Sequence, residues 1–280
     1  MVKKYDAVVI GAGNGGLTAA ARLAKEGKRV ALLEQHNMPG GFATSFVRGR
    51  FEFEPSLHEL CDLGSEEKPG AIRALFGDLG VRLEWCPMKD AFRTILTDDP
   101  DLKDYTMPFG TKEFTDKMEE YVPGSRESTE KFILLCEDLN RAVNYMTEAS
   151  GHVDPKVMQK EHTNFLKCAP YSVNEVLDAL KMPKAAQKIL GSYWCYIGVP
   201  LDRLSFFFYA IMVYKYLVGG AYIPKDRSHA ISVALAERVM ALGGEVWCNT
   251  RAEKILMRGG KPWAVQTSRG LLETEHVICC

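Results

Sequence analysis

The residues best suited to chemistry are a glycine-rich turn near the N-terminus and an acid that follows it. Gly11, Gly13 and Gly16 have the spacing G-x-G-x-x-G, directly after the apolar run at residues 7–10. In a dinucleotide site the first glycine makes a tight turn, the second lets backbone approach a pyrophosphate, and the third lets a helix pack closely on the strand. Glu34 lies within the roughly 20-residue distance expected for a carboxylate that binds a ribose hydroxyl and disfavours a 2′-phosphate. The segment therefore predicts a dinucleotide site.

The elements that must position these residues are also predicted by the pattern. The apolar runs at residues 7–10 and 30–33 are typical of buried parallel strands, and Gly27 ends the helix between them. The N-terminal amides and dipole of that helix would face the phosphates. A glycine turn alone also fits an ordinary loop, but strand, helix, second strand and acid agree here. The small residues of the helix share one face suited to close packing: Leu17, Ala20, Ala21 and Ala24.

A second glycine turn begins five residues after Glu34, where residues 39–46 read PGGFATSF. Gly40 and Gly41 would let the backbone approach a ligand closely, and Thr44 or Ser45 would donate hydrogen bonds. By itself this segment indicates only a Pro-Gly turn that feeds a hairpin. Together with the first turn and the acid, it resembles the FAD-binding start of the flavoproteins of the amine oxidase and phytoene desaturase superfamily. The resemblance implies that this turn approaches the flavin side of an extended FAD.

A later segment strengthens the resemblance. Residues 219–225 read GGAYIPK and lead into a predicted helix at 230–242, a predicted strand at 245–248, and NTRAEKI at 249–255. This order is similar to that of phytoene desaturases, carotenoid isomerases and retinol saturases. In such proteins the backbone at the position of Ala252 contacts the adenine, and here Ala replaces the usual Val.

The resemblance implies FAD as the cofactor and an α/β fold. We expect a Rossmann-like FAD-binding domain at residues 1–68 plus 219–280, with an inserted α+β substrate domain at 69–218. Within the insertion, strands at 92–97 and 105–107 would form a hairpin around the acidic turn at 98–101, and helices are predicted at 111–121, 125–149, 173–180 and 183–198. The residues expected to bind FAD are Gly11, Ala12, Gly13, Asn14, Gly15, Gly16, Glu34, Gln35, Gly40, Gly41, Thr44, Ser45 and Ala252.

The function implied is that of an FAD-dependent oxidoreductase that desaturates, saturates or isomerises carbon-carbon bonds of a lipophilic, carotenoid- or retinoid-like substrate. An amine oxidase-like flavoenzyme is the near alternative. Relatives typically continue well beyond the strand predicted at 277–278. A second class of hypothesis is therefore a non-catalytic N-terminal fragment, or half of a split enzyme that needs a complementing C-terminal polypeptide.

Catalytic side chains are few. His58 stands where related proteins often have G-x-H after F-x-x-D/E, which makes it the candidate for proton transfer near a flavin. Pro55 and Ser56 replace the expected glycine context, so a hydrogen-bonded structural histidine is the favoured interpretation. The aromatic residues of the segment 193–196 fit either a pocket lining or core.

Composition excludes other classes. The 280 residues carry a net charge of −1, so no basic excess points to nucleic acid. Eight cysteines without C-x-x-C and six scattered histidines give no metal pattern and favour a reduced, cytoplasmic protein. The apolar segment 204–218 is shorter than the roughly 20 residues that span a bilayer. It fits a buried core helix, the lining of a tunnel for a lipophilic substrate, or a peripheral membrane contact.

Overall fold

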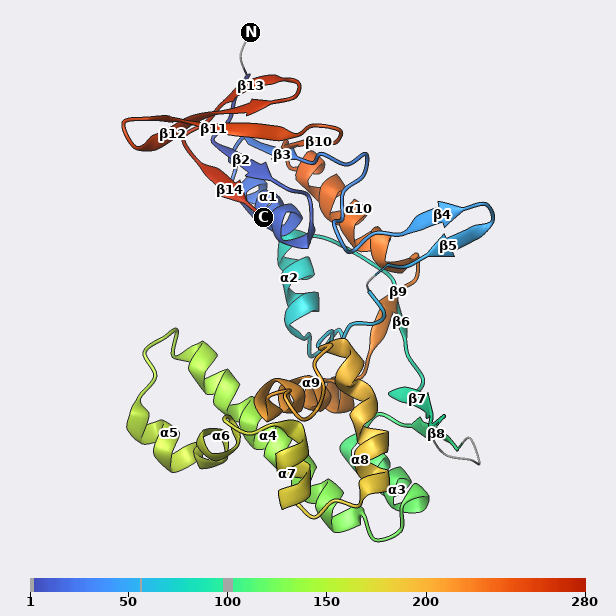
Figure 1. Ribbon diagram of the computed structural model, residues 1–280. Helices are drawn as coiled ribbons and strands as arrows, with labels where there is room; N and C mark the ends of the chain where they lie inside the picture. Colours follow the sequence, from blue (N-terminus) through green and yellow to red (C-terminus); the bar gives the residue numbers. More distant parts are fainter. Residues whose placement is uncertain (1–2, 56, 98–102) are drawn as a thin grey trace. The chain divides into compact units, whose positions relative to one another are not determined.

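A computed structural model describes residues 3–55, 57–97 and 103–280 (Figure 1). The chain divides into two compact units, Met1–Pro87 with Tyr222–Cys280 and Met88–Ala221. The first unit extends past the boundary predicted at residue 68. The reason is that α2 (Ala71–Leu79) buries Phe76 and Leu79 in the core of this unit.

The first unit is built on a parallel sheet whose strand order is β10-β3-β2-β14. These strands are Glu245–Trp247, Val30–Leu33, Ala7–Ile10 and Val277–Cys279, respectively. Side chains of β2 and β3 are buried on both faces, as a covered parallel sheet requires. The apolar runs therefore predicted the central strands correctly.

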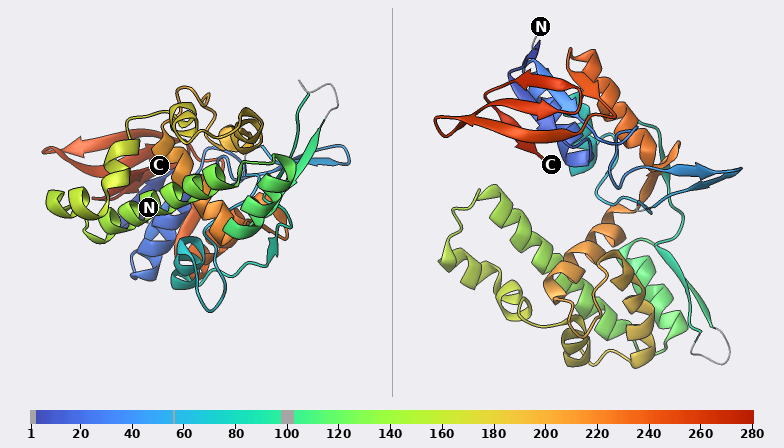
Figure 2. Two further views of the ribbon diagram at one scale, coloured as in Figure 1. Left: turned by 90° about the horizontal axis from the view of Figure 1, so that it is seen from below. Right: turned by 45° about the horizontal axis from the view of Figure 1, so that its top comes forward.

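Helices cover one face of this sheet and a second sheet covers the other (Figures 1 and 2). On the helical face, α1 (Asn14–Lys25) and α10 (Arg227–Ala241) pack their small and aliphatic side chains against the strands. On the other face lies a sheet of order β1-β13-β12-β11. Its strands are Lys3–Lys4, Gly270–Glu273, Lys261–Thr267 and Ala252–Arg258. The predicted α/β, Rossmann-like fold is confirmed.

Two short strand pairs complete the first unit. β4 (Phe46–Arg48) and β5 (Phe51–Phe53) form an antiparallel hairpin. β6 (Trp85–Pro87) pairs with β9 (Tyr222–Pro224), which joins the two chain segments of the unit.

The second unit combines a hairpin with helices. β7 (Phe92–Ile95) pairs with β8 (Asp104–Met107), as the sequence predicted, while the acidic turn at 98–101 lies outside the described residues. The predicted helix at 183–198 is instead an α-helix to Leu190 followed by a 3-10 helix, η1 (Gly191–Tyr196), which places Tyr193 in the core. The helices are α3 (Thr111–Tyr121), α4 (Arg126–Glu148), α5 (Pro155–Glu161), α6 (Thr163–Cys168), α7 (Val173–Ala179), α8 (Lys184–Leu190) and α9 (Phe206–Gly219).

The apolar segment predicted at 204–218 forms α9. Phe206, Tyr209 and Val213 are fully buried, and Phe132 of α4 contacts the rings of Phe206 and Tyr209. This packing agrees with the interpretation of a core helix for that face. Among the helices that the structure describes, none combines the length and the apolar character that crossing a bilayer requires.

Candidate cofactor site

A cavity of about 640 Å³ lies at the carboxyl ends of the parallel strands. This is the edge where open α/β sheets bind ligands. Both predicted glycine turns and the end of β3 contribute to its wall. The lining residues are Ile10, Gly11, Gly13, Asn14, Leu33, Glu34, Gln35, Gly40, Gly41, Phe42, Ala43, Thr250, Arg251, Ala252 and Cys280.

The three glycines of the first turn have different steric surroundings. Gly11 has a φ of +96°, and a Cβ there would lie 2.6 Å from the Cys280 carbonyl oxygen. A Cβ on Gly16 would lie 1.9 Å from the carbonyl oxygen of Gly11. A Cβ on Gly13, by contrast, would meet nothing within 4 Å, although Gly13 lines the cavity. The fold itself therefore requires Gly11 and Gly16, whereas Gly13 leaves room for a ligand.

The second glycine turn is bonded directly to the first. The Gly40 N–H donates to the Ala12 carbonyl at 2.7 Å, and a Cβ on Gly41 would lie 3.2 Å from the Gly13 Cα. Gly40 and Gly41 have φ values of +132° and +59°, which favour glycine. From α10, the buried Ser232 hydroxyl donates to the Ala43 carbonyl at 2.7 Å and fixes the far side of the turn. Two segments far apart in sequence thus form one backbone cradle.

Glu34 supports the first turn from the end of β3. Its Oε2 accepts a hydrogen bond from the Ala12 N–H at 2.9 Å, and its Oε1 accepts one from the His36 N–H at 2.8 Å. A carboxylate has about four lone-pair sites, so acceptor capacity remains for a ligand hydroxyl. Burial raises the pKa of the nearby Cys248 thiol, and the charge of Glu34 raises it further. That thiol is therefore protonated at neutral pH, which argues against a nucleophilic role.

The N-terminus of α1 points its amides toward the cavity. The helix begins at Asn14, its N-cap is Gly13, and no side chain caps it. The first N–H groups of a helix have no partner within the helix, and the dipole places partial positive charge there. The first turn of α1 also contains no acidic residue. This end therefore suits a phosphate group.

The structure brings most of the predicted binding residues to the cavity. Asn14, Gln35 and Ala252 line it, while Ala12 is buried and acts through its backbone, and Gly15 and Gly16 lie in the first turn of α1 away from the lining.

Three further predicted residues, Thr44, Ser45 and His58, are also absent from the lining of the cavity. The Thr44 hydroxyl lies 3.3 Å from the Met38 sulfur, and the Ser45 hydroxyl donates to Glu52 at 2.7 Å. His58 is exposed and is absent from the lining of the cavity. The role of His58 in proton transfer stays a prediction.

Residues that the sequence did not single out also line the cavity. Thr250 and Arg251 follow β10, and Cys280 follows β14, where its N–H donates to the Ile10 carbonyl at 2.9 Å. The sequence indicated these residues only indirectly, through the strands that precede them. Once residues 245–248 and 277–278 are taken as parallel strands, the residues after them must reach the same edge as the glycine turn.

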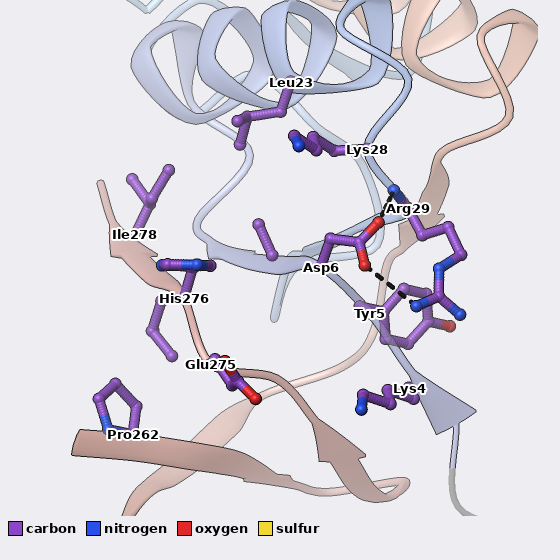
Figure 3. Close-up of a pocket in the computed structure, with 12 residues that line it drawn as sticks. Lys4, Tyr5, Asp6, Leu23, Lys28, Arg29, Pro262, Glu275, His276 and Ile278 are labelled. Atoms are coloured by element: carbon purple, nitrogen blue, oxygen red, sulfur yellow. Dashed lines mark hydrogen bonds and ion pairs between the residues drawn. The ribbon is translucent and has the colours of Figure 1, made fainter.

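A second, larger cavity of about 830 Å³ lies at the amino ends of β2, β3 and β14 (Figure 3). Asp6 and Arg29 in its wall are paired, because Asp6 accepts hydrogen bonds from the Arg29 backbone at 2.8 Å and from its guanidinium at 3.0 Å, while Lys4, Lys28 and Glu275 also line it. The hydrogen bond from the Arg29 side chain lowers the pKa of Asp6. No glycine turn and no helix N-terminus contributes to this lining, so it lacks the backbone donors of the first cavity. Across the described ranges, no cluster of three or more His, Cys, Asp or Glu residues could hold a metal ion.

Comparison with known proteins agrees with this assignment of the fold. Residues 9–76 match the family described as NAD(P)-binding Rossmann-like domain. The chain is similar in fold to a solved oxidoreductase from Methanosarcina mazei, with a TM-score of 0.66, 19% identity, and 99% of this chain and 58% of that chain covered. It is also similar to a solved putrescine oxidase, with a TM-score of 0.64, 17% identity, and 100% of this chain and 58% of that chain covered.

Sequence relatives point to a narrower group. The all-trans-retinol 13,14-reductase of Homo sapiens is 28% identical over 287 residues, which cover 99% of this chain and 46% of the relative. The phytoene dehydrogenase of Streptomyces griseus is 26% identical over 284 residues, which cover 97% of this chain and 52% of the relative. The chain thus spans about half the length of these relatives. The predicted resemblance is confirmed: the chain is a homologue of the retinol 13,14-reductases, phytoene dehydrogenases and carotenoid desaturases and isomerases.

Proposed function

We propose that the cavity at the carboxyl ends of the strands holds the adenosine diphosphate part of FAD. We further propose that the chain serves an oxidoreductase that desaturates, saturates or isomerises carbon-carbon bonds of a lipophilic, retinoid- or carotenoid-like substrate. The observation that carries the proposal is the cradle formed by the two glycine turns, with the Gly40 N–H bonded to the Ala12 carbonyl beside the start of α1.

The chain's own groups fit the parts of such a ligand. The first amides of α1 would bind the pyrophosphate, and the open space at Gly13 would admit it. The remaining acceptor sites of Glu34 would bind ribose hydroxyls, and its charge would repel a 2′-phosphate. Ala252, Arg251 and Gln35 would surround the adenosine end. Gly40 and Gly41 would guide the ligand toward its flavin end.

A bound flavin supplies hydride transfer at a carbon-carbon bond, while the protein supplies orientation and exclusion of water. Carbon-carbon chemistry is favoured over amine oxidation by the relatives' names, which refer to retinol, phytoene, hydroxycarotenoid and prolycopene. Similarity to putrescine oxidase rests on 17% identity and supports the shared fold alone.

A second proposal concerns whether the chain can turn over a substrate alone. The relatives that this chain matches are about twice as long, and we propose that turnover by residues 1–280 requires a complementing C-terminal polypeptide. A non-catalytic fragment is the remaining alternative. No disulfide joins the cysteines of the described residues, which is compatible with the cytoplasmic location that we propose.

The test is an anaerobic mixing experiment on the FAD-loaded chain, alone and co-expressed with the C-terminal half of a phytoene dehydrogenase. Bleaching of the oxidised flavin by a retinoid or carotenoid supports desaturation, and reoxidation of chemically reduced flavin by the same compound supports saturation. An isomerised product by chromatography supports isomerisation. Bleaching by putrescine and not by polyenes would replace the proposal with amine oxidation. FAD binding without any conversion, even with the C-terminal half present, would identify a non-catalytic protein.

A further inference from the structure

One face of the hairpin β4–β5 carries phenylalanine side chains. The other face includes Glu52, which contacts Arg227 at the start of α10. Cross-strand pairs in the register are Phe46 with Phe53 and Arg48 with Phe51, and directly opposed residues point to the same side. The rings of Phe46 and Phe53 stack with centroids 5.1 Å apart. Phe46, Phe51 and Phe53 are nevertheless 41%, 58% and 45% exposed. The hairpin projects as a thin ribbon from its unit (Figures 1 and 2).

The opposite face of the hairpin is attached to the unit. Glu52 lies on that face, where its Oε2 is 3.3 Å from the Arg227 guanidinium at the start of α10 and its Oε1 accepts from Ser45 at 2.7 Å. Val47, which is paired with Glu52, is 59% exposed. The attachment therefore holds the hairpin at Glu52 and leaves both faces of the ribbon in contact with solvent.

The tip of the hairpin is positively charged. The Arg48 guanidinium lies 5.1 Å from the centre of the Phe46 ring, and the Arg50 guanidinium lies 5.1 Å from that of Phe51. Within the described part of the chain, neither arginine has an ion-pair partner, since the carboxylate of Glu52 is engaged by Arg227. Two cations thus flank three exposed aromatic rings on one small ribbon.

We propose that this hairpin docks on an anionic lipid surface. Aromatic rings with adjacent basic side chains suit the boundary between headgroups and acyl chains, where the rings are buried and the cations bind lipid phosphates. The two arginines complement the negative charge of such a surface, and insertion of the exposed rings removes their apolar area from water. Phe42, which is 85% exposed, extends the apolar surface to the rim of the cofactor cavity.

The experiment is sedimentation of the 280-residue chain with vesicles of phosphatidylcholine alone, or with about one third phosphatidylserine. We expect binding to the anionic vesicles that weakens with salt. The double variant R48E/R50E should bind at least tenfold more weakly, and Phe51→Ala severalfold more weakly. The matched control is R258E/K261E, which reverses two charges at the tip of the β11–β12 hairpin. It should bind vesicles as the unaltered chain does.

Circular dichroism checks that each variant is folded. Hydrogen exchange measures the protection of backbone amides in the hairpin itself. Residues 46–53 should gain amide protection when anionic vesicles are added, with residues 254–264 unchanged. The proposal is overturned if the unaltered chain stays in the supernatant, or if the β11–β12 variant loses as much binding as R48E/R50E. It is equally overturned if Phe51→Ala only dissociates a dimer seen by light scattering. None of these measurements requires bound flavin, so they are independent of the proposed function.

Discussion

The two ends of one parallel sheet bear cavities of different character. At the amino ends the cavity is larger, about 830 Å³, and is lined by charged side chains, of which Asp6 and Arg29 bind each other. At the carboxyl ends the cavity is about 640 Å³ and is formed by glycine turns and the uncapped start of α1. Backbone donors that have no partner attract a ligand, whereas a paired side-chain charge gains little from one. The position of free backbone N–H donors therefore distinguishes the proposed cofactor site better than the volume of the cavity does.

The largest expected effect comes from Gly16→Ala. The new Cβ would lie 1.9 Å from the Gly11 carbonyl oxygen, which belongs to backbone and cannot rotate away. We expect a loss of about 3 kcal/mol or more in unfolding free energy, measured by denaturant titration. Its neighbour Gly15 is the control, because a Cβ there would meet nothing within 4 Å. Gly15→Ala should be neutral or stabilise the chain by up to about 1 kcal/mol, and an equal loss for both variants would refute the packing argument.

Glu34→Gln should weaken the carboxyl-end site. The amide group can accept only one of the two hydrogen bonds now donated by the Ala12 and His36 backbones, and the other N–H loses its partner. The expected cost is about 1–3 kcal/mol in stability, with at least a tenfold loss in FAD affinity by fluorescence titration. Glu237→Gln on the exposed side of α10 should change neither quantity. Unchanged FAD affinity in Glu34→Gln would remove this residue from the site.

Ser232→Ala should loosen the second glycine turn, although Ser232 itself does not line the cavity. Its buried hydroxyl donates to the Ala43 carbonyl, so the variant should lose about 1 kcal/mol in stability and a few-fold in FAD affinity. Ser228→Ala, one turn earlier on α10, removes a hydroxyl that donates to Glu54 instead. That control should lose stability but keep the FAD affinity of the unaltered chain. Equal FAD affinities in the two variants would contradict a role for the turn.

The smallest effect is expected at the amino ends, from Asp6→Asn. The pKa of Asp6 is lowered, so its ion pair with Arg29 stabilises the folded chain above the ordinary aspartate pKa. This stabilisation is lost as the pH falls below about 4, through the lowered pKa. Unfolding followed from neutral to acid pH should show a shallower decline for Asp6→Asn. FAD affinity should stay unchanged, and a large loss of affinity would mean that the wrong cavity has been assigned.

Local patterns located much of the wall of the carboxyl-end cavity, because the first half of that wall is contiguous in sequence. The buried strands at 7–10 and 30–33, the turn at 11–16 and Glu34 are all close neighbours along the chain, so spacing alone locates them. Thr250 and Cys280 reach the cavity only through the pairing of β10 with β3 and of β14 with β2. Such pairing depends on tertiary contacts that no local pattern encodes.

Side-chain direction was harder to predict than backbone position. Thr44 and Ser45 follow the second turn as the pattern requires, but their hydroxyls bond to Met38 and Glu52 rather than line the cavity. The first segment of the first unit ends at Pro87 rather than at residue 68, because α2 buries Phe76 and Leu79 in the core of this unit. In both cases the deciding contacts lie outside the segment that suggested the prediction.

The central claim is that FAD binds at the carboxyl ends of the strands, and Gly13→Val tests it most directly. The φ of Gly13 is −72° and a Cβ there meets nothing within 4 Å, so the variant should fold with its side chain in ligand space, at a cost of about 1–2 kcal/mol for replacing the N-cap glycine of α1. Titration with FAD, followed by quenching of flavin fluorescence, should show one-to-one binding to the unaltered chain and its loss in Gly13→Val. Equal FAD affinity in a folded Gly13→Val variant would contradict the account.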